Sequence, residues 1–232
     1  MDLTLIVATL KWSGWEKCVR SWFPTEDVTS GAHLHLIHSA EGHLSILQAY
    51  QQGLKSTSSP ILGYVHDDVI VRDEEWFARV IKEFDDPGVG MVGFGGALRH
   101  GSTSLYQKPY RLAQLGRSDF RSNMFDAERH GKRFTRACDV AVLDGFAMFV
   151  RREILEKAGG WPVGTPIGYF CYDYWLSCEV RRQGYRIRLV GVACTHLGGK
   201  SSSAVQVMES PQDAHRHIYD TCRDVLPFKV SP

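Results

Sequence analysis

Strand-like and helix-like patterns alternate along this chain, and the alternation constrains the fold more than any other feature. Apolar runs rich in β-branched residues are typical of buried strands, and four of them are LTLIVATL, HLHLIHSAEG, PILGYVHDDVIV and VGMVGFGG. Segments with helical spacing, such as RDEEWFARVIKEF, lie between or after these runs. This order favours helices packed on the faces of one sheet. We therefore expect an α/β fold with a central mixed, mostly parallel sheet flanked by helices.

Capping residues suggest where several helices begin and end. Ser13 is a candidate N-cap for a helix near residues 15–22, and Asp73 is a candidate N-cap for the next acidic helix. Gly184 follows a helical pattern and precedes a strand-like run, so we expect it to end that helix. Ser210, with Pro211 directly after it, predicts the start of a C-terminal helix.

The third strand-like run contains an unusual polar insertion, His66-Asp67-Asp68. Ionised groups are costly to remove from water, so two acids within an apolar run need solvent or a ligand. Asp73 already supplies the acidic cap for the following helix, which leaves the pair without that structural role. In open α/β sheets ligands bind beyond the carboxyl ends of strands, and carboxylates beside an imidazole suit Mg²⁺ or Mn²⁺.

Composition excludes several other classes of protein. The chain has 232 residues, is 44% hydrophobic and has no run of 18 apolar residues, so we expect no transmembrane segment. Six cysteines lack any CxxC pair, which indicates reduced thiols and a cytoplasmic location. The segment GFGGAL is not the GxGxxG signature of dinucleotide-binding proteins, because Leu98 occupies its last position. The sequence also lacks the GxxxxGK[ST] signature of phosphate-loop proteins and the GxSxG signature of α/β-hydrolases.

Positive charge is concentrated in one segment although the net charge is only +1. Residues 99–136 contain nine Lys or Arg and three Asp or Glu. This basic band either contacts a phosphate-bearing partner or is an ordinary solvated surface, and its composition allows both.

Two separated blocks of the sequence resemble the inverting family-2 glycosyltransferases, which have the GT-A fold. The first block contains an N-terminal strand, a second strand, a helix and a strand that ends in a DxD-like motif: LTLIVATL, HLHLIHSAEG, SILQAYQQGL and PILGYVHDDV. The second contains an RRE helix, a GG-aromatic corner, an acidic helix start and a late histidine: VLDGFAMFVRREILEKAGGW and YFCYDYWLSCEVRRQGYRIRLVGVACTHLGG. The resemblance implies sugar transfer with inversion from a nucleotide-sugar donor, UDP-sugar foremost, to an acceptor hydroxyl, assisted by Mn²⁺ or Mg²⁺.

The resemblance also implies roles for individual residues on the donor side. Asp68 and His196 match the metal-binding positions, although His66 stands where the DxD motif usually begins with Asp. The remaining positions that match donor-binding elements are Ala8, Thr9, Glu41, His66, Asp67 and Lys200. Lys200 lies in GGKSSS, which is either a mobile lid or a plain exposed loop.

On the acceptor side, Asp173 falls on the position of the family's general base, and a helix N-cap is the structural alternative for it. Tyr172 stands where a Glu usually precedes that base. Asp144 and Gly145 match an acceptor-binding turn, and Trp161 is either a sugar-stacking platform or a core residue.

We interpret residues 1–232 as a single glycosyltransferase domain. Its expected parts are a nucleotide-sugar half (1–98), an acceptor-side segment (99–136), an acceptor and catalytic half (137–200) and a C-terminal lid and helix (201–232). The acceptor would be phosphate-bearing, as in a lipid-linked glycan or a nucleic acid, if the basic band binds it. Two alternatives remain open, namely a catalytically silent nucleotide- or sugar-binding protein of the same fold and a nucleotidyltransferase.

Overall fold

The computed structural model describes the chain except for residues 11–12, 24–30, 40–43, 102–119, 125–131, 135, 199–209 and 231–232. The helices within these described residues are α1 (Trp15–Arg20), α2 (Ile46–Ser56), α3 (Trp76–Glu83), α4 (Arg152–Lys157), α5 (Tyr172–Arg182) and α6 (Pro211–Thr221). The strands up to the basic band are β1 (Leu3–Thr9), β2 (Ala32–His38), β3 (Ile61–His66), β4 (Val69–Val71), β5 (Val89–Gly93), β6 (Gly95–Ala97) and β7 (Arg99–His100). Those that follow are β8 (Phe120–Ser122), β9 (Cys138–Val140), β10 (Val142–Leu143), β11 (Ala147–Arg151), β12 (Arg186–Leu189), β13 (Cys194–His196) and β14 (Phe228–Lys229).

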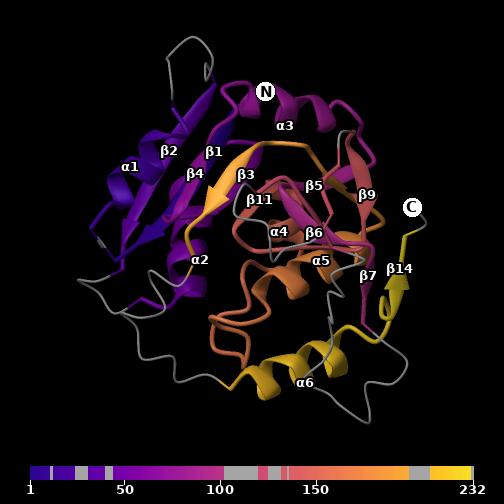
Figure 1. Ribbon diagram of the computed structural model, residues 1–232. Helices are drawn as coiled ribbons and strands as arrows, with labels where there is room; N and C mark the ends of the chain where they lie inside the picture. The colour runs from indigo at the N-terminus through magenta and orange to yellow at the C-terminus, as the bar shows by residue number, and fades with distance from the viewer. Residues whose placement is uncertain are drawn as a thin grey trace.

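A seven-stranded mixed sheet forms the centre of the molecule, in the order β2-β1-β3-β11-β5-β12-β9 (Figure 1). Strands β2, β1, β3, β5 and β12 run in one direction, whereas β11 and β9 run in the other. The expected α/β architecture is therefore confirmed. Strand β11 lies between β3 and β5, so a late segment of the chain completes the middle of the sheet.

Helices cover both faces of this sheet because side chains alternate along its strands. On β1, Leu3, Leu5 and Val7 join the buried cluster that contains the apolar residues of α1 and α3. Ile6, between them, joins the cluster of α2, α4, α5 and α6. The molecule thus has three layers and two cores, one on each face of the sheet.

The helix boundaries follow the predicted caps in part. Ser210 accepts the backbone N–H of Asp213 at 3.3 Å with Pro211 as the first residue of α6, as predicted. The predicted stop at Gly184 is also confirmed, since this residue has φ +83° two residues after α5. Ser13 is not an N-cap, because Gly14 takes that position in a left-handed conformation.

Asp73 caps the turn that leads into α3 rather than the helix itself. Its Oδ1 accepts the N–H of Glu75 at 3.0 Å, and Glu75 is the N-cap residue of α3. The acidic stretch therefore starts the helix two residues later than the sequence indicates.

The predicted strand through residues 61–71 is interrupted at Asp67 and Asp68, which form a turn between β3 and β4. Strand β4 pairs with β13 in an antiparallel two-stranded sheet, in which Val69 lies opposite His196. Within the described parts of the chain, two further small sheets are present, β10-β6-β8 and β14-β7.

The described cysteines form no disulfide, and all but Cys138 are buried, as expected for reduced thiols. Among the described residues, none of the helices combines the length and apolar character needed to span a membrane.

Candidate functional site

Three side chains from two distant segments converge at the end of β3. His66 is the last residue of β3, Asp68 lies in the turn that follows, and His196 ends β13. The β4–β13 pairing brings the two segments together, and Leu197 donates its backbone N–H to the carbonyl of Asp68 at 3.0 Å. Backbone pairing therefore holds His196 beside a carboxylate 128 positions earlier in the chain.

The donor atoms of this cluster are spaced as ligands of one ion. Asp68 Oδ1 lies 3.3 Å from His196 Nε2 and 3.8 Å from His66 Nδ1, and the two ring nitrogens are 3.4 Å apart. Ligands bound to one ion at about 2.1 Å lie about 3.0–3.6 Å from each other, close to these separations. Asp68 Oδ1 is buried and accepts no well-aligned hydrogen bond from the described residues. The cluster therefore fits a divalent cation.

The ionisation states of these groups also suit a cation. Burial and the neighbouring His196 lower the pKa of His66 to about 4, so its imidazole is neutral and has a free lone pair. Burial alone would raise the pKa of Asp68, but His196 and His66 more than offset it and hold the pKa below its usual value. Asp68 is thus a carboxylate, the form that binds metal.

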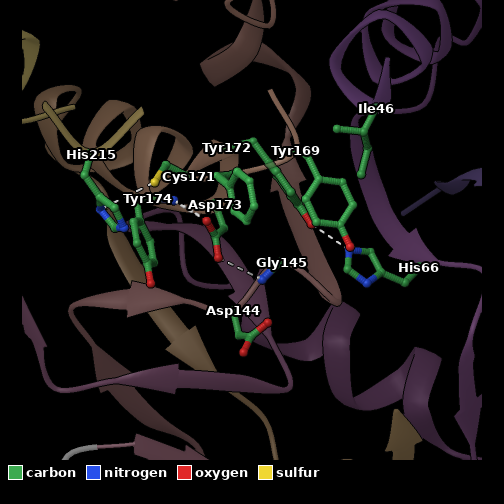
Figure 2. A pocket seen from close by; sticks show the side chains of 11 residues that line it. Ile46, His66, Asp144, Gly145, Tyr169, Cys171, Tyr172, Asp173, Tyr174 and His215 are labelled. Carbon is green, nitrogen blue, oxygen red and sulfur yellow. Dashed lines mark hydrogen bonds between the residues drawn. The ribbon is translucent and has the colours of Figure 1, made fainter. Parts of the chain in front are cut away.

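A cavity of about 220 Å³ lies beside this cluster and reaches the start of α5 (Figure 2). His66 lines one part of it, and Asp144, Gly145 and Asp173 line another. Asp144 and Gly145 belong to the turn between β10 and β11, while Asp173 lies in the first turn of α5. The cavity therefore joins one candidate metal ligand, His66, to a half-buried pair of carboxylates.

Asp173 is held by backbone groups and poised to exchange a proton. Its Oδ2 accepts the N–H of Gly145 at 3.2 Å, and its Oδ1 accepts the N–H of Tyr174 at 2.9 Å. Burial and the nearby charge of Asp144 raise the pKa of Asp173 to about 7, although the hydrogen bonds oppose the shift. A carboxyl group with this pKa can act as a base near neutral pH. The N-cap of α5 is Cys171, so Asp173 is not the cap.

Tyr172 connects the two parts of the site. Tyr172 is buried, and its hydroxyl lies 2.6 Å from Nε2 of His66. A dashed line marks this hydrogen bond in Figure 2. Gly145 provides the space for it, because a Cβ at that position would overlap the Tyr172 ring and hydroxyl. The first turn of α5 thus contacts both the metal cluster and the β10–β11 turn.

The other residues singled out in the sequence lie in different environments. Ala8 is opposite His66 in the β1–β3 register, and Thr9 ends β1. Asp67 is 2% exposed. Trp161 is 4% exposed and packs against Tyr50, Tyr64, Tyr172 and Trp175, so it is a core residue rather than an open stacking platform.

Some predicted features fall outside the described part of the chain. These are Glu41, Lys200 with most of the GGKSSS segment, and most of the basic band.

Several cavity residues were not identified from the sequence. They are Ile46, Tyr169, Phe170, Cys171, Tyr174 and His215. His215 comes from α6, and its Nδ1 lies 3.6 Å from Sγ of Cys171. Aromatic residues near Asp173 in the sequence are a weak local signal, whereas nothing in the pattern of α6 relates His215 to the cavity.

Solved structures with this fold include glycosyltransferases. The mannosyltransferase PcManGT from Pyrobaculum calidifontis, in complex with GDP-Man and Mn²⁺, is 15% identical with a TM-score of 0.53, covering 94% of this chain and 69% of that one. GalNAc-T7 with UDP, GalNAc and Mn²⁺ is 11% identical with a TM-score of 0.60, covering 96% of this chain and 50% of that one. A197 from STIV is 14% identical with a TM-score of 0.50, covering 86% of this chain and 87% of that one. These similarities show the GT-A fold.

A search of curated protein sequences found no match. A family model described as a glycosyltransferase-like family matches residues 5–215, which include both blocks of motifs and the basic band between them. The chain therefore belongs to this glycosyltransferase-like family.

Proposed function

We propose that this chain transfers a sugar from a nucleotide-sugar donor, a UDP-sugar foremost, to an acceptor hydroxyl with inversion at the anomeric carbon. One observation carries the proposal: His66, from a cluster fitted to a divalent cation, and Asp173, a half-buried carboxyl group with a pKa of about 7, line the same cavity. The similar structures support it, because PcManGT is in complex with GDP-Man and Mn²⁺ and GalNAc-T7 with UDP, GalNAc and Mn²⁺.

Asp68, His196 and His66 would hold the cation on the donor side, and two imidazole ligands favour Mn²⁺ over Mg²⁺. When bound, the cation supplies positive charge that stabilises the departing nucleoside diphosphate. Ala8, Thr9 and Asp67 border this region and are assigned to the donor.

Asp173 is the general base in this proposal. It removes the proton of the acceptor hydroxyl as the acceptor oxygen bonds to the anomeric carbon. The bond from that carbon to the diphosphate oxygen breaks, and its electron pair leaves with the diphosphate. This single displacement occurs on the face opposite the leaving group and inverts the configuration. Asp144 and Gly145 are assigned to the acceptor, and Gly145 also positions the base through its N–H.

The test is a screen of nucleotide sugars with Mn²⁺ and a panel of neutral and phosphate-bearing hydroxyl acceptors. We expect release of a nucleoside diphosphate and an inverted product anomer by NMR. Asp173→Asn should bind the donor normally but transfer the sugar roughly 10²–10⁴-fold more slowly, the usual contribution of a general base. Donor binding without turnover would instead indicate a silent binding protein, and release of pyrophosphate would indicate a nucleotidyltransferase.

A further inference from the structure

The contact between Tyr172 and His66 joins two positions at which the chain departs from its family resemblance. His66 stands in place of an acid in the DxD-like motif, and Tyr172 stands in place of the acid before the base. The two side chains come from β3 and α5, and their polar atoms are 2.6 Å apart. Two acidic groups at this distance would repel each other unless one were protonated, whereas an imidazole and a phenol form a hydrogen bond.

The direction of this hydrogen bond decides which nitrogen of His66 is free. A neutral imidazole has one N–H and one lone pair, and its hydrogen-bond partner selects between the two tautomers. Nδ1 is the atom that faces Asp68 Oδ1 and His196 Nε2, at 3.8 and 3.4 Å. A lone pair on Nδ1 requires the proton on Nε2, where the oxygen of Tyr172 accepts it.

Tyr172 is well anchored for this task. It is 5% exposed, and its ring packs edge-on against Tyr50 at 5.8 Å and Trp161 at 6.3 Å. Its place in the first turn of α5, next to Asp173, also fixes its distance from the candidate base.

We propose that Tyr172 is a positioning residue that locks His66 in its Nε2–H tautomer, so that the lone pair of Nδ1 completes a cation site with Asp68 and His196. This inference rests on the proposed metal site and deepens it. Hydrogen-bond partners of metal-bound histidines raise metal affinity by orienting the ring and selecting its tautomer.

The first experiment measures Mn²⁺ affinity without nucleotide, from the EPR signal of the free ion, for the native chain, Tyr172→Phe and Tyr64→Phe. Tyr172→Phe removes only the hydroxyl, and we expect Mn²⁺ binding to weaken 10–100-fold. Tyr64→Phe removes a buried hydroxyl from the same aromatic cluster, where Tyr64 contacts Tyr50 and Trp161, and should bind Mn²⁺ normally. Unchanged affinity in Tyr172→Phe, or equal losses in both variants, would overturn the inference.

The second experiment does not depend on the Tyr172→Phe variant. Nitrogen NMR of the ¹⁵N-histidine-labelled native chain, with His66 assigned by comparison with His66→Gln, should show the proton on Nε2 of His66. A proton on Nδ1 would overturn the inference even if Tyr172→Phe failed to fold.

The inference and the proposed function can fail separately. Tyr172-dependent Mn²⁺ binding in a chain that transfers no sugar would retain the inference and remove the proposed function. If the native chain transfers sugar but Tyr172→Phe binds Mn²⁺ normally, the proposed function is retained and the inference about Tyr172 is wrong.

Discussion

At the scale of single residues, Asp173 shows how burial sets the chemistry of this site. Its carboxyl group is partly buried, shares the cavity with Asp144 and accepts two backbone N–H groups. Burial and the charge of Asp144 disfavour the ionised form of Asp173, whereas the two backbone hydrogen bonds favour it. The resulting pKa is about 7. The sequence identified the position through its resemblance to the family base, but the pKa depends on neighbours 28 and 29 residues away in the chain.

This pKa predicts the pH dependence of sugar transfer. A general base acts in its ionised form, so activity should rise about tenfold per pH unit below 7 and level off above it. Asp144→Asn removes a negative charge that raises the pKa of Asp173. The rise of activity with pH should therefore occur at lower pH in this variant than in the native chain. The measurement is the turnover rate from pH 5 to 9 at saturating donor and acceptor. The same pH dependence in the native chain and in Asp144→Asn would contradict the assignment of Asp173 as the general base.

The metal cluster was only partly predictable from the sequence. The sequence assigned Asp68 and His196 to metal and His66 to the donor, yet the structure groups all three within ligand distance of one another. The turn at Asp67 and Asp68 changes the direction of the chain, and strand periodicity alone does not reveal that turn.

At the scale of secondary-structure elements, the position of α2 depends on close contact with β1. Gly53 is buried in α2, and a Cβ built on it would lie 2.5 Å from Cγ2 of Ile6. The helix itself was predictable from the apolar spacing of Ile46, Leu47, Tyr50 and Leu54, but its distance from the sheet is a tertiary feature.

Gly53→Ala should therefore destabilise the fold even though alanine favours helices. The intrinsic gain is at most about 1 kcal/mol, whereas overpacking a core costs about 1–3 kcal/mol. We expect a net loss of about 1–2 kcal/mol in urea unfolding. Gln52→Ala, on the exposed face of the same helix, should change stability by less than about 0.5 kcal/mol. A more stable Gly53→Ala variant would show that α2 moves freely away from β1.

Arg152 secures the junction of α4, α2 and β3. Its guanidinium donates to the carbonyls of Ser59 and Leu54 at 2.8 and 2.9 Å and to Oγ1 of Thr57 at 2.8 Å, and its side chain is 14% exposed. Its position at the C-terminal end of α2 also suits the negative end of the helix dipole.

Arg152→Lys keeps the charge but cannot reproduce three donors in a planar fork. Hydrogen bonds from charged groups contribute about 1.5–3 kcal/mol each, so we expect a loss of about 2–4 kcal/mol in the free energy of unfolding. Arg20→Lys is the matched control, because the Arg20 side chain is 83% exposed and should tolerate the change. Equal stability of both variants would mean that solvent replaces the lost contacts.

At the scale of the whole molecule, the order of the strands is the feature that local patterns reveal least. Periodicity and capping identified most of the strands and helices, and the resemblance led to the GT-A architecture. The pairing of β13 with β4, however, joins segments more than 120 residues apart, and β13 is only three residues long. Such a short strand has little signal of its own, because its conformation depends on its partner.

The β4–β13 pairing predicts a variant that weakens metal binding without unfolding the chain. Leu197→Pro removes the N–H that bonds the carbonyl of Asp68, which frees His196 to move away from that carboxylate. Leu197 is 40% exposed, so little core packing is lost. We expect Mn²⁺ affinity to fall at least about tenfold while the thermal midpoint changes little, and Leu197→Ala, which keeps the N–H, should bind normally. Native affinity in Leu197→Pro would show that the pairing is not needed for the site.

The position of β11 between β3 and β5 has a consequence for the synthesis of this protein on the ribosome. When only residues 1–98 have emerged, β3 and β5 lack the neighbour that separates them, and each presents an unpaired edge. Open edges of apolar strands invite wrong pairing, and β3 is fully buried up to Val65 in the finished protein. Those edges are first covered when residues 147–151 arrive, and the histidine of β13 follows some 45 positions later. The nascent chain therefore passes through a long aggregation-prone interval, which makes it a natural client for chaperones that shield hydrophobic strands.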